Sequence, residues 1–107
     1  IKVTGGSDNV LIDNNIIRTD NNNGIEIAVW ENVSSNATIT NNTIGNIGTI
    51  PGMTGNGDGS STAITSMCAN SLIQYNKIDT VGYIGITANR NYSVIKNNAI
   101  NYFCTIK

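Results

Sequence analysis

The sequence of 107 residues contains no histidine and a single proline. The absence of histidine excludes a Ser-His-Asp or Cys-His triad, an imidazole general base and histidine-ligated zinc or copper. Charged residues are also scarce, at 12% of the chain, against roughly 25% in a typical soluble domain. The apolar fraction of 39% is still large enough for a hydrophobic core, which excludes disorder driven by charge.

Positively charged residues are few, and long apolar runs are absent. The chain has six basic residues, scattered along its length, and a formal net charge of -1. Because binding to nucleic-acid phosphates requires a basic stripe, we expect no nucleic-acid partner. No apolar run approaches the roughly 18 residues of a membrane span, and no basic-then-apolar secretion signal opens the chain. We therefore predict no membrane span, and the length allows one domain at most.

Asparagine and isoleucine, by contrast, are abundant, with 19 and 18 residues, and they recur in a nine-residue pattern. Each copy places an isoleucine, then an asparagine three residues later, then an isoleucine two residues after that. The four copies are NVLIDNNII at 9–17, NATITNNTI at 36–44, NSLIQYNKI at 70–78 and YSVIKNNAI at 92–100. They are 27, 34 and 22 residues apart, so 22 residues is the minimal period. The longer intervals carry insertions around 30–36 and in the Gly-rich stretch 49–61.

Each copy of the repeat predicts short β-strands. Apolar and polar residues alternate with a period of two, and β-branched residues are enriched. Strands this short cannot bury a face alone, so we expect them to stack, each coil about 4.8 Å from the next. A second apolar column precedes the repeat, and its predicted members are Val3, Ile27, Ile64, Ile86 and Ile106.

The repeated motif resembles that of right-handed parallel β-helix proteins, the pectate-lyase-like superfamily, over nearly the whole chain. The resemblance implies an all-β fold, a right-handed parallel β-helix (β-solenoid) of about four to five coils. It implies one β-helix segment over 1–107, with 49–61 as a protruding Gly-rich loop, and an extracellular or cell-surface location. Neither end carries a capping helix, so we expect a segment of a longer solenoid or open ends that associate with other chains.

The resemblance also assigns a role to the repeated asparagine. In such helices an inward asparagine sits at a tight turn and stacks on the same residue of the neighbouring coils. Asparagine suits this place because it tolerates the left-handed backbone region and its amide both donates and accepts hydrogen bonds. The predicted ladder consists of Asn15, Asn42, Asn76 and Asn98.

Glu26 is the one acidic candidate for chemistry on the first strand column. The segment NNNGIEIAV, with Gly24 and Glu26, resembles the strand that carries a calcium-binding acid in β-helix alginate and chondroitin lyases, but it lacks that family's lysine base. A solvated strand residue is the alternative. If the protein is an enzyme, the resemblance implies a polysaccharide lyase or glycoside hydrolase, yet no complete set of carboxylates and base is visible. The predicted outward rows are Lys2, Glu26, Ala63, Gly85, Thr105 and Thr4, Ala28, Thr65, Thr87, Lys107.

Three other residues are candidates for ligand binding. Trp30, the only tryptophan, could stack on a sugar ring or pack on Met67, which shares its predicted level. Arg90 shares a predicted level with Glu31, two coils away. Asp58 is the only acid in the Gly-rich stretch. Ca²⁺ binding and a plain flexible loop both remain open for this stretch, since one acid is little evidence for a Ca²⁺ site. No metal site is assigned, and no other cofactor is predicted.

The second strand of each copy carries an outward apolar stripe, Leu11, Leu72 and Val94, interrupted by Thr38. Such stripes indicate contact with a flanking segment, a second subunit or a ligand, or they are ordinary surface residues. Cys68 and Cys104 fall in different columns two coils apart, so no disulfide is expected.

The sequence thus favours two functions. The first is an extracellular β-helix module that binds or processes polysaccharide, as the resemblance implies. The alternative is a structural or adhesive β-solenoid module of a surface fibre or filament, without catalysis, that associates through its open ends. Glycan binding or turnover characterises the first function, and end-to-end oligomers characterise the second.

Overall fold

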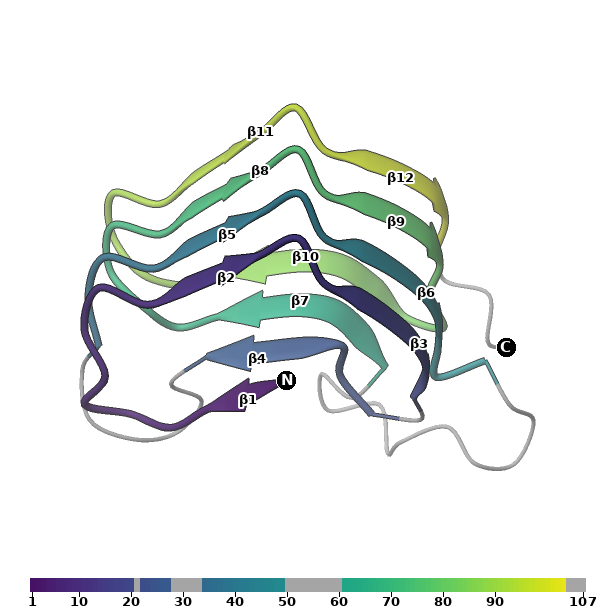
Figure 1. Ribbon diagram of the computed structural model, residues 1–107, viewed down its shortest axis with the longest axis horizontal. Helices are drawn as coiled ribbons and strands as arrows, with labels where there is room; N and C mark the ends of the chain where they lie inside the picture. The colour runs from purple at the N-terminus through teal and green to yellow at the C-terminus, as the bar shows by residue number, and fades with distance from the viewer. Residues whose placement is uncertain (21, 28–33, 50–60, 104–107) are drawn as a thin grey trace.

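The structure, a computed structural model, describes residues 1–20, 22–27, 34–49 and 61–103. Over these residues the chain is all-β and forms a parallel β-helix of about four coils (Figure 1). Each coil contributes one strand to each of three parallel sheets. The β-solenoid predicted from the repeat is therefore confirmed.

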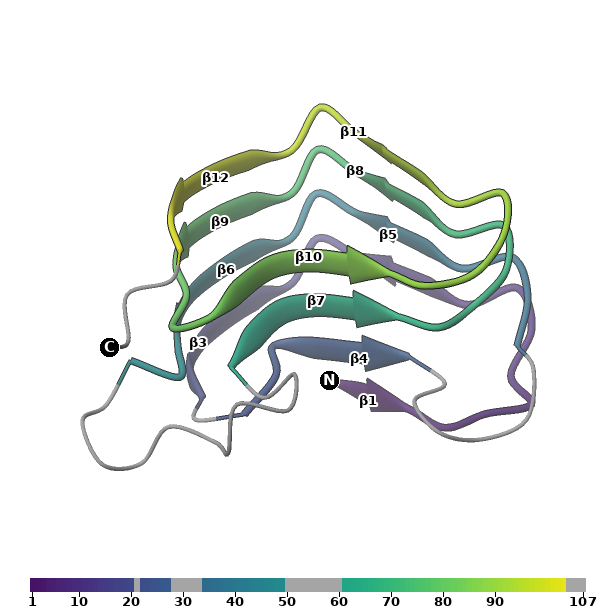
Figure 2. The same cartoon turned by 180° about the vertical axis from the view of Figure 1, so that it is seen from behind.

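The three sheets are named A, B and C in the order in which the chain enters them. Figure 2 shows sheet A from the side opposite to Figure 1. Sheet A contains β1 (Lys2–Val3), β4 (Ile25–Ile27), β7 (Thr62–Ser66) and β10 (Ile84–Ala88). Sheet B contains β2 (Leu11–Asp13), β5 (Thr38–Thr40), β8 (Leu72–Gln74) and β11 (Val94–Lys96). Sheet C contains β3 (Ile16–Asp20), β6 (Thr43–Ile47), β9 (Lys77–Thr80) and β12 (Ala99–Tyr102).

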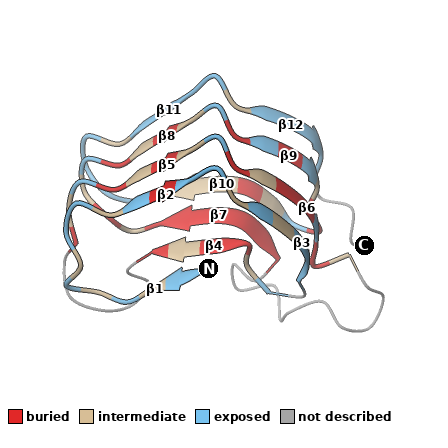
Figure 3. Ribbon diagram, in the orientation of Figure 1, coloured by how far each residue is buried: buried red, intermediate tan, exposed pale blue. Residues whose placement is uncertain are grey.

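The isoleucine columns predicted from the repeat form the core in sheets B and C. Ile12, Ile39, Ile73 and Ile95 pair in register through sheet B, and the isoleucines two residues after the ladder asparagine pair through sheet C. In the middle coils these side chains are completely buried (Figure 3). Each buried isoleucine stabilises the fold by about 2 kcal/mol relative to an exposed one.

In sheet A the register differs from the prediction at one step. The sequence predicts Ile27 opposite Ile64, but Ile27 lies opposite Ser66, and Ile64 pairs with Ile25. The predicted register between β1 and β4, and between β7 and β10, is correct. The displacement is two residues, and strand side chains alternate with a period of two. The same faces therefore remain buried, and alternation alone cannot reveal the shift.

The shift corrects the predicted outward rows. The row of Glu26 runs from Lys2 through Thr65 to Thr87. The prediction that Ala63 faces outward is wrong, because Ala63 is completely buried. The levels proposed for Trp30 and Glu31 rested on the displaced register. Both of these residues, and the predicted row and column members at 28 and 105–107, lie outside the described residues.

Gly85, also predicted to face outward, instead faces a core side chain. A Cβ added there would lie 2.8 Å from Ile100 Cδ1. Two positions earlier in the same column, a Cβ at Gly24 would lie 2.7 Å from the carbonyl oxygen of Ala63 and 3.0 Å from a methyl group of Ile44. This column therefore accepts only very small residues, because isoleucines of sheet C occupy the space in front of it.

The predicted asparagine ladder is present between sheets B and C. The amides of Asn15, Asn42 and Asn76 each donate from Nδ2 to the Oδ1 of the next ladder asparagine, at 3.0, 2.9 and 2.9 Å along the stack. The same Oδ1 also accepts the backbone N–H of the donor's residue. Asn42 and Asn76, in the middle of the ladder, are completely buried.

The ladder asparagines themselves are not the residues in the left-handed backbone region. That conformation belongs to the residue before each of them, so the predicted left-handed position is wrong. The four corner residues have φ between 54° and 58°, and they are Asn14, Asn41, Tyr75 and Asn97. A second left-handed corner precedes sheet B, at Asn9, Asn36, Asn70 and Tyr92. There Asn36 Nδ2 donates to Asn9 Oδ1 at 3.2 Å, and Asn70 Nδ2 donates to Asn36 Oδ1 at 3.4 Å. The second, exposed asparagine ladder was not predicted.

The apolar stripe of sheet B lies in one column, as predicted. Leu11, Thr38, Leu72 and Val94 pair in register, and Leu11 is 66% exposed.

Candidate functional site

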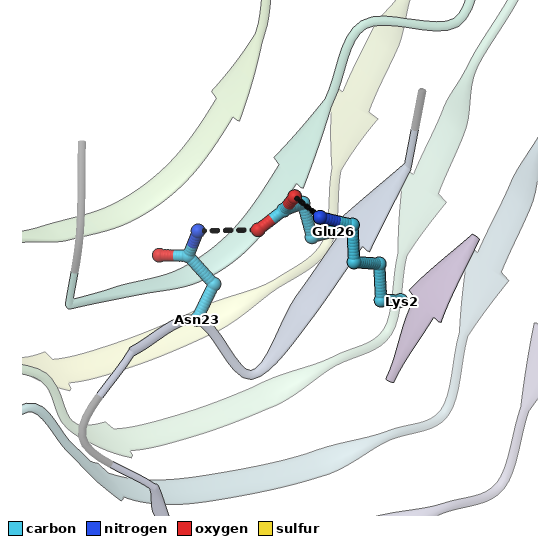
Figure 4. A network of polar contacts seen from close by, with 3 residues as sticks. All are labelled: Lys2, Asn23 and Glu26. Carbon is cyan, nitrogen blue, oxygen red and sulfur yellow. Dashed lines mark hydrogen bonds and ion pairs between the residues drawn. The ribbon is translucent and has the colours of Figure 1, made fainter. Parts of the chain in front are cut away.

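Glu26 is held by two neighbours in a small polar network (Figure 4). Its Oε1 lies 3.2 Å from Lys2 Nζ, and its Oε2 accepts a hydrogen bond from Asn23 Nδ2 at 2.9 Å. The Asn23 Oδ1 in turn accepts the backbone N–H of Thr62 at 3.0 Å. Because Lys2 is largely exposed, the ion pair contributes at most about 1 kcal/mol. Both carboxylate oxygens thus have protein partners, and the network connects three successive coils.

The other three residues named from the sequence do not join Glu26. Arg90 is exposed in the turn after β10, where its backbone carbonyl accepts a hydrogen bond from Ser93 Oγ at 3.0 Å. Among the described residues, no hydrogen bond or ion pair joins it to Glu26. Trp30 and Asp58 lie outside the described residues, so the structure does not test their predicted roles. Across the part of the chain that the structure describes, no three His, Cys, Asp or Glu side chains lie close enough to hold a metal ion.

Cys68 is buried beside two serines. Ser71 Oγ donates to the Cys68 carbonyl at 2.7 Å, and Ser66 Oγ accepts the Cys68 N–H at 3.3 Å. Burial is the main cause that raises the pKa of the Cys68 thiol above its ordinary value. This side chain is therefore a protonated core residue rather than a nucleophile. Its predicted lack of a bond to Cys104 cannot be judged, since residue 104 is outside the described ranges.

The solvent side of sheet C carries two adjoining depressions that share Thr43 and Lys77, which we call the sheet C groove. Their volumes are about 200 and 280 Å³. Small side chains at Thr43 and Ala99 leave room between the longer ones. The residues that line the groove are Asn41, Asn42, Thr43, Tyr75, Lys77, Ile78, Asp79, Ala99 and Asn101.

Tyr75 is the most unusual residue of the sheet C groove. Its φ is 55°, a left-handed conformation that costs a side-chain-bearing residue roughly 1–2 kcal/mol. The equivalent residues of the other three coils are all asparagine, which adopts this conformation more easily. Despite that cost Tyr75 is 53% exposed, so burial does not compensate for the strain. Strained residues of this kind cluster at ligand sites.

The polar groups of the groove offer both charge and hydrogen bonds. Asn101 Nδ2 donates to Asp79 Oδ1 at 3.2 Å, and Asn41 Nδ2 donates to Asp13 Oδ1 at 3.0 Å. Lys77 is exposed, and among the described residues no carboxylate lies within ion-pair distance of its Nζ. The groove therefore combines one aromatic ring, one unpaired cation and amide groups on the same face.

Neither Tyr75 nor Lys77 is among the residues that the sequence predicted as a site. A signal for Tyr75 does exist in the aligned repeats, where it replaces the asparagine that precedes the ladder position in the other copies. No such signal marks Lys77. The residue type at its position differs in every copy of the repeat, where the other residues are Ile16, Thr43 and Ala99, so a lysine does not stand out.

Comparison of the chain with protein-family models, with curated proteins and with solved structures yields no match. The class that the fold defines is a β-solenoid with stacked asparagines. The described part of the chain contains no helix of the length and apolarity that a membrane crossing requires.

Proposed function

We propose that this chain is an extracellular β-helix module that binds polysaccharide along the sheet C groove. The observation that carries the proposal is Tyr75, an exposed aromatic ring held in a strained backbone conformation above a depression lined by polar groups. The resemblance of the repeat to the pectate-lyase-like superfamily agrees with this proposal, and membership in that superfamily is part of it.

The neighbours of Tyr75 suit stacking on a sugar ring. In the coils on either side, the corner residues are Asn41 and Asn97, whose short side chains leave the aromatic ring accessible. An aromatic ring presents an apolar face of large area at low cost in conformational entropy. Amide groups beside it supply donors and acceptors for hydroxyl groups. This combination fits a saccharide better than an apolar ligand.

Lys77 favours an acidic saccharide over a neutral one. It lines both depressions of the groove and lacks an ion-pair partner in the described residues. A uronate carboxylate beside Lys77 Nζ would form a charge-assisted hydrogen bond, which is roughly twice as strong as a neutral one. The expected ligand is therefore a uronate-containing polysaccharide.

Affinity electrophoresis and calorimetry with polygalacturonate and with a neutral glucan test the proposal. Tyr75→Asn, which places in this coil the residue that the other coils have, is expected to weaken binding about tenfold, corresponding to about 1.4 kcal/mol. Lys77→Gln is expected to weaken binding of polygalacturonate and to leave binding of the glucan unchanged.

Tyr92→Asn provides the matched control. Tyr92 is also exposed and left-handed, with φ of 61°, but it lies at the corner before sheet B and does not line the groove. Its replacement should leave binding unchanged. The proposal is wrong if neither polysaccharide binds the native chain, or if Tyr75→Asn and Tyr92→Asn have equal effects.

The alternative function is a structural module of a fibre. The observation that favours it is the outward apolar stripe of sheet B, where Leu11 is 66% and Val94 is 47% exposed.

A further inference from the structure

The outer side of sheet B carries two columns of side chains, which together we call the sheet B face. One column is apolar except at Thr38, and the other is polar. Leu11 in β2 is 66% exposed and Val94 in β11 is 47% exposed (Figure 3). An apolar column with this exposure indicates a contact surface. The apolar column is Leu11, Thr38, Leu72 and Val94, and the polar column is Asp13, Thr40, Gln74 and Lys96.

The two charged residues of the sheet B face lie at opposite ends of the polar column. Asp13 belongs to the first strand of the sheet and Lys96 to the fourth, and both are exposed. Asp13 Oδ1 accepts a hydrogen bond from Asn41 Nδ2 at 3.0 Å. Within the described residues, neither Asp13 nor Lys96 has an ion-pair partner. Each can therefore take a partner of opposite charge from another molecule.

The order of these charges makes the sheet B face complementary to itself when a second copy is turned end for end. A two-fold axis along the strands places β2 of one copy opposite β11 of the other. The apolar column then faces the apolar column, and the polar column faces the polar column. Asp13 lies opposite the partner's Lys96, and Lys96 lies opposite the partner's Asp13. One operation thus creates two opposite-charge pairs and one continuous apolar contact.

A two-fold axis along the stack gives a poorer fit. It places β2 opposite β2 and exchanges the columns, so that each apolar column faces a polar one. Asp13 would then lie against the partner's Leu11, with no cation opposite it. A charge that loses its water without gaining a partner is costly. Hydrophobic contact and charge therefore favour the same orientation, with the two stacks antiparallel.

We infer that the sheet B face docks the same face of a second copy of this chain, with the two stacks antiparallel. Both copies contribute the same residues, so the contact is closed and association ends at two copies. Sheets that pack face to face lie about 10 Å apart, a gap that an aspartate and a lysine side chain together span. The inference is independent of polysaccharide binding, which uses sheet C.

The size of the sheet B face predicts a weak dimer. The face consists of four strands of three residues each. These strands cover roughly 10 by 19 Å, which is less than the roughly 800 Å² per partner of a standard interface. Because the face lies along the side of the stack, further coils would lengthen it and leave it exposed. Association is therefore measured at concentrations up to about 1 mM.

Leu11→Ala and Ile16→Ala form a matched pair that tests the apolar column. Both residues are exposed apolar side chains of the first coil, but Ile16, which is 73% exposed, belongs to sheet C. Since neither side chain is buried in the monomer, both variants should keep the native fold. We expect Leu11→Ala to weaken dimer formation about tenfold, because it removes apolar contact at two symmetric places. Ile16→Ala should leave dimer formation unchanged.

Asp13→Lys and Lys96→Glu test the orientation. Asp13→Lys leaves lysines at both ends of the polar column, and Lys96→Glu leaves acids at both ends. Each variant alone brings two like-charge pairs together in the antiparallel dimer, so it should associate about tenfold more weakly at low ionic strength. An equimolar mixture forms heterodimers with two opposite-charge pairs, so association should return to the native level.

Sedimentation equilibrium measures the association, and circular dichroism melts establish that each variant is folded. The melts matter because Asp13 also accepts a hydrogen bond from Asn41. A native dimer that Leu11→Ala weakens, with recovery in the charge mixture, supports the inference. A native chain that stays monomeric, or growth beyond two copies, would overturn it. Equal effects of Leu11→Ala and Ile16→Ala, or charge variants that dimerise alone as well as the native chain, would also overturn it.

Discussion

Asn42 Nδ2 donates a hydrogen bond to Asn76 Oδ1 at 2.9 Å, and both side chains are completely buried. The same Asn76 oxygen accepts the backbone N–H of Asn42 at 3.0 Å, and Asn42 Nδ2 also reaches the carbonyl of Ile12. The amides thus satisfy backbone groups at a corner where no strand partner is available. Since an unsatisfied buried polar group is costly, the ladder keeps the corner between sheets B and C ordered.

Replacement of Asn76 by alanine should destabilise the fold strongly. It removes the acceptor for two donors of Asn42 and the donor to the carbonyl of Ile39. Because these groups are buried, we expect the free energy of unfolding to fall by about 4 kcal/mol, measured by urea denaturation. Asn98→Ala, at the partly exposed end of the ladder, should cost only about 1–2 kcal/mol, since removal of this side chain opens its partners to water. Equal losses would contradict the role of burial.

Two glycines of the same column should respond differently to alanine. At Gly24 the new Cβ would lie 2.7 Å from the backbone oxygen of Ala63, which cannot move without shifting β7. At Gly85 it would meet Ile100 Cδ1, the end of a flexible side chain at the open end of the stack. We expect Gly24→Ala to lower stability by about 2 kcal/mol and Gly85→Ala by less than about 1 kcal/mol, measured by denaturant unfolding. The reverse order would show that the column is packed differently.

Relief of backbone strain should stabilise the corners. Tyr75→Asn and Tyr92→Asn each replace a left-handed tyrosine by the residue that adopts this conformation in the other coils. Each should raise the free energy of unfolding by about 1 kcal/mol. This corresponds to a rise of roughly 4–8 °C in Tm by scanning calorimetry. A fall in Tm for either variant would mean that the exposed ring makes stabilising contacts.

The buried thiol of Cys68 predicts a dependence of stability on pH. Burial raises its pKa in the folded state, so the unfolded chain loses its proton first as the pH rises. The contribution of the thiol to stability is therefore complete below the unfolded pKa of about 8.5 and is lost as the pH rises from there through the folded pKa.

In a Cys104→Ser background, iodoacetamide should label Cys68 rapidly in urea and very slowly in the native state. Rapid native labelling would contradict its burial.

Much of the fold follows from the nine-residue repeat. The repeat contains both the isoleucine of sheet B and the isoleucine of sheet C, with the ladder asparagine between them. Because the copies align without gaps, the registers of sheets B and C and the partners of Asn15 and Asn98 are all predictable from the sequence. A slip of one residue would expose the whole apolar set, which makes this register unambiguous.

The groove could not be predicted in the same way. Tyr75 and Lys77 lie in the third coil, Asn41 in the second and Asn101 in the fourth, so only stacking brings them onto one surface. The sequence instead drew attention to Glu26, whose carboxylate is occupied by Lys2 and Asn23.

By itself the sequence determined the parallel β-helix, the asparagine ladder and the registers of sheets B and C, because the repeated spacing of apolar and amide residues allows only one stacking. The tertiary structure alone decided the register of sheet A, where Ile25 and not Ile27 pairs with Ile64. Both isoleucines face the core, so a displacement of two residues leaves the alternation unchanged. The choice between them depends on the three-dimensional fit of Gly24 against Ala63 and Ile44, which no pattern along the chain records.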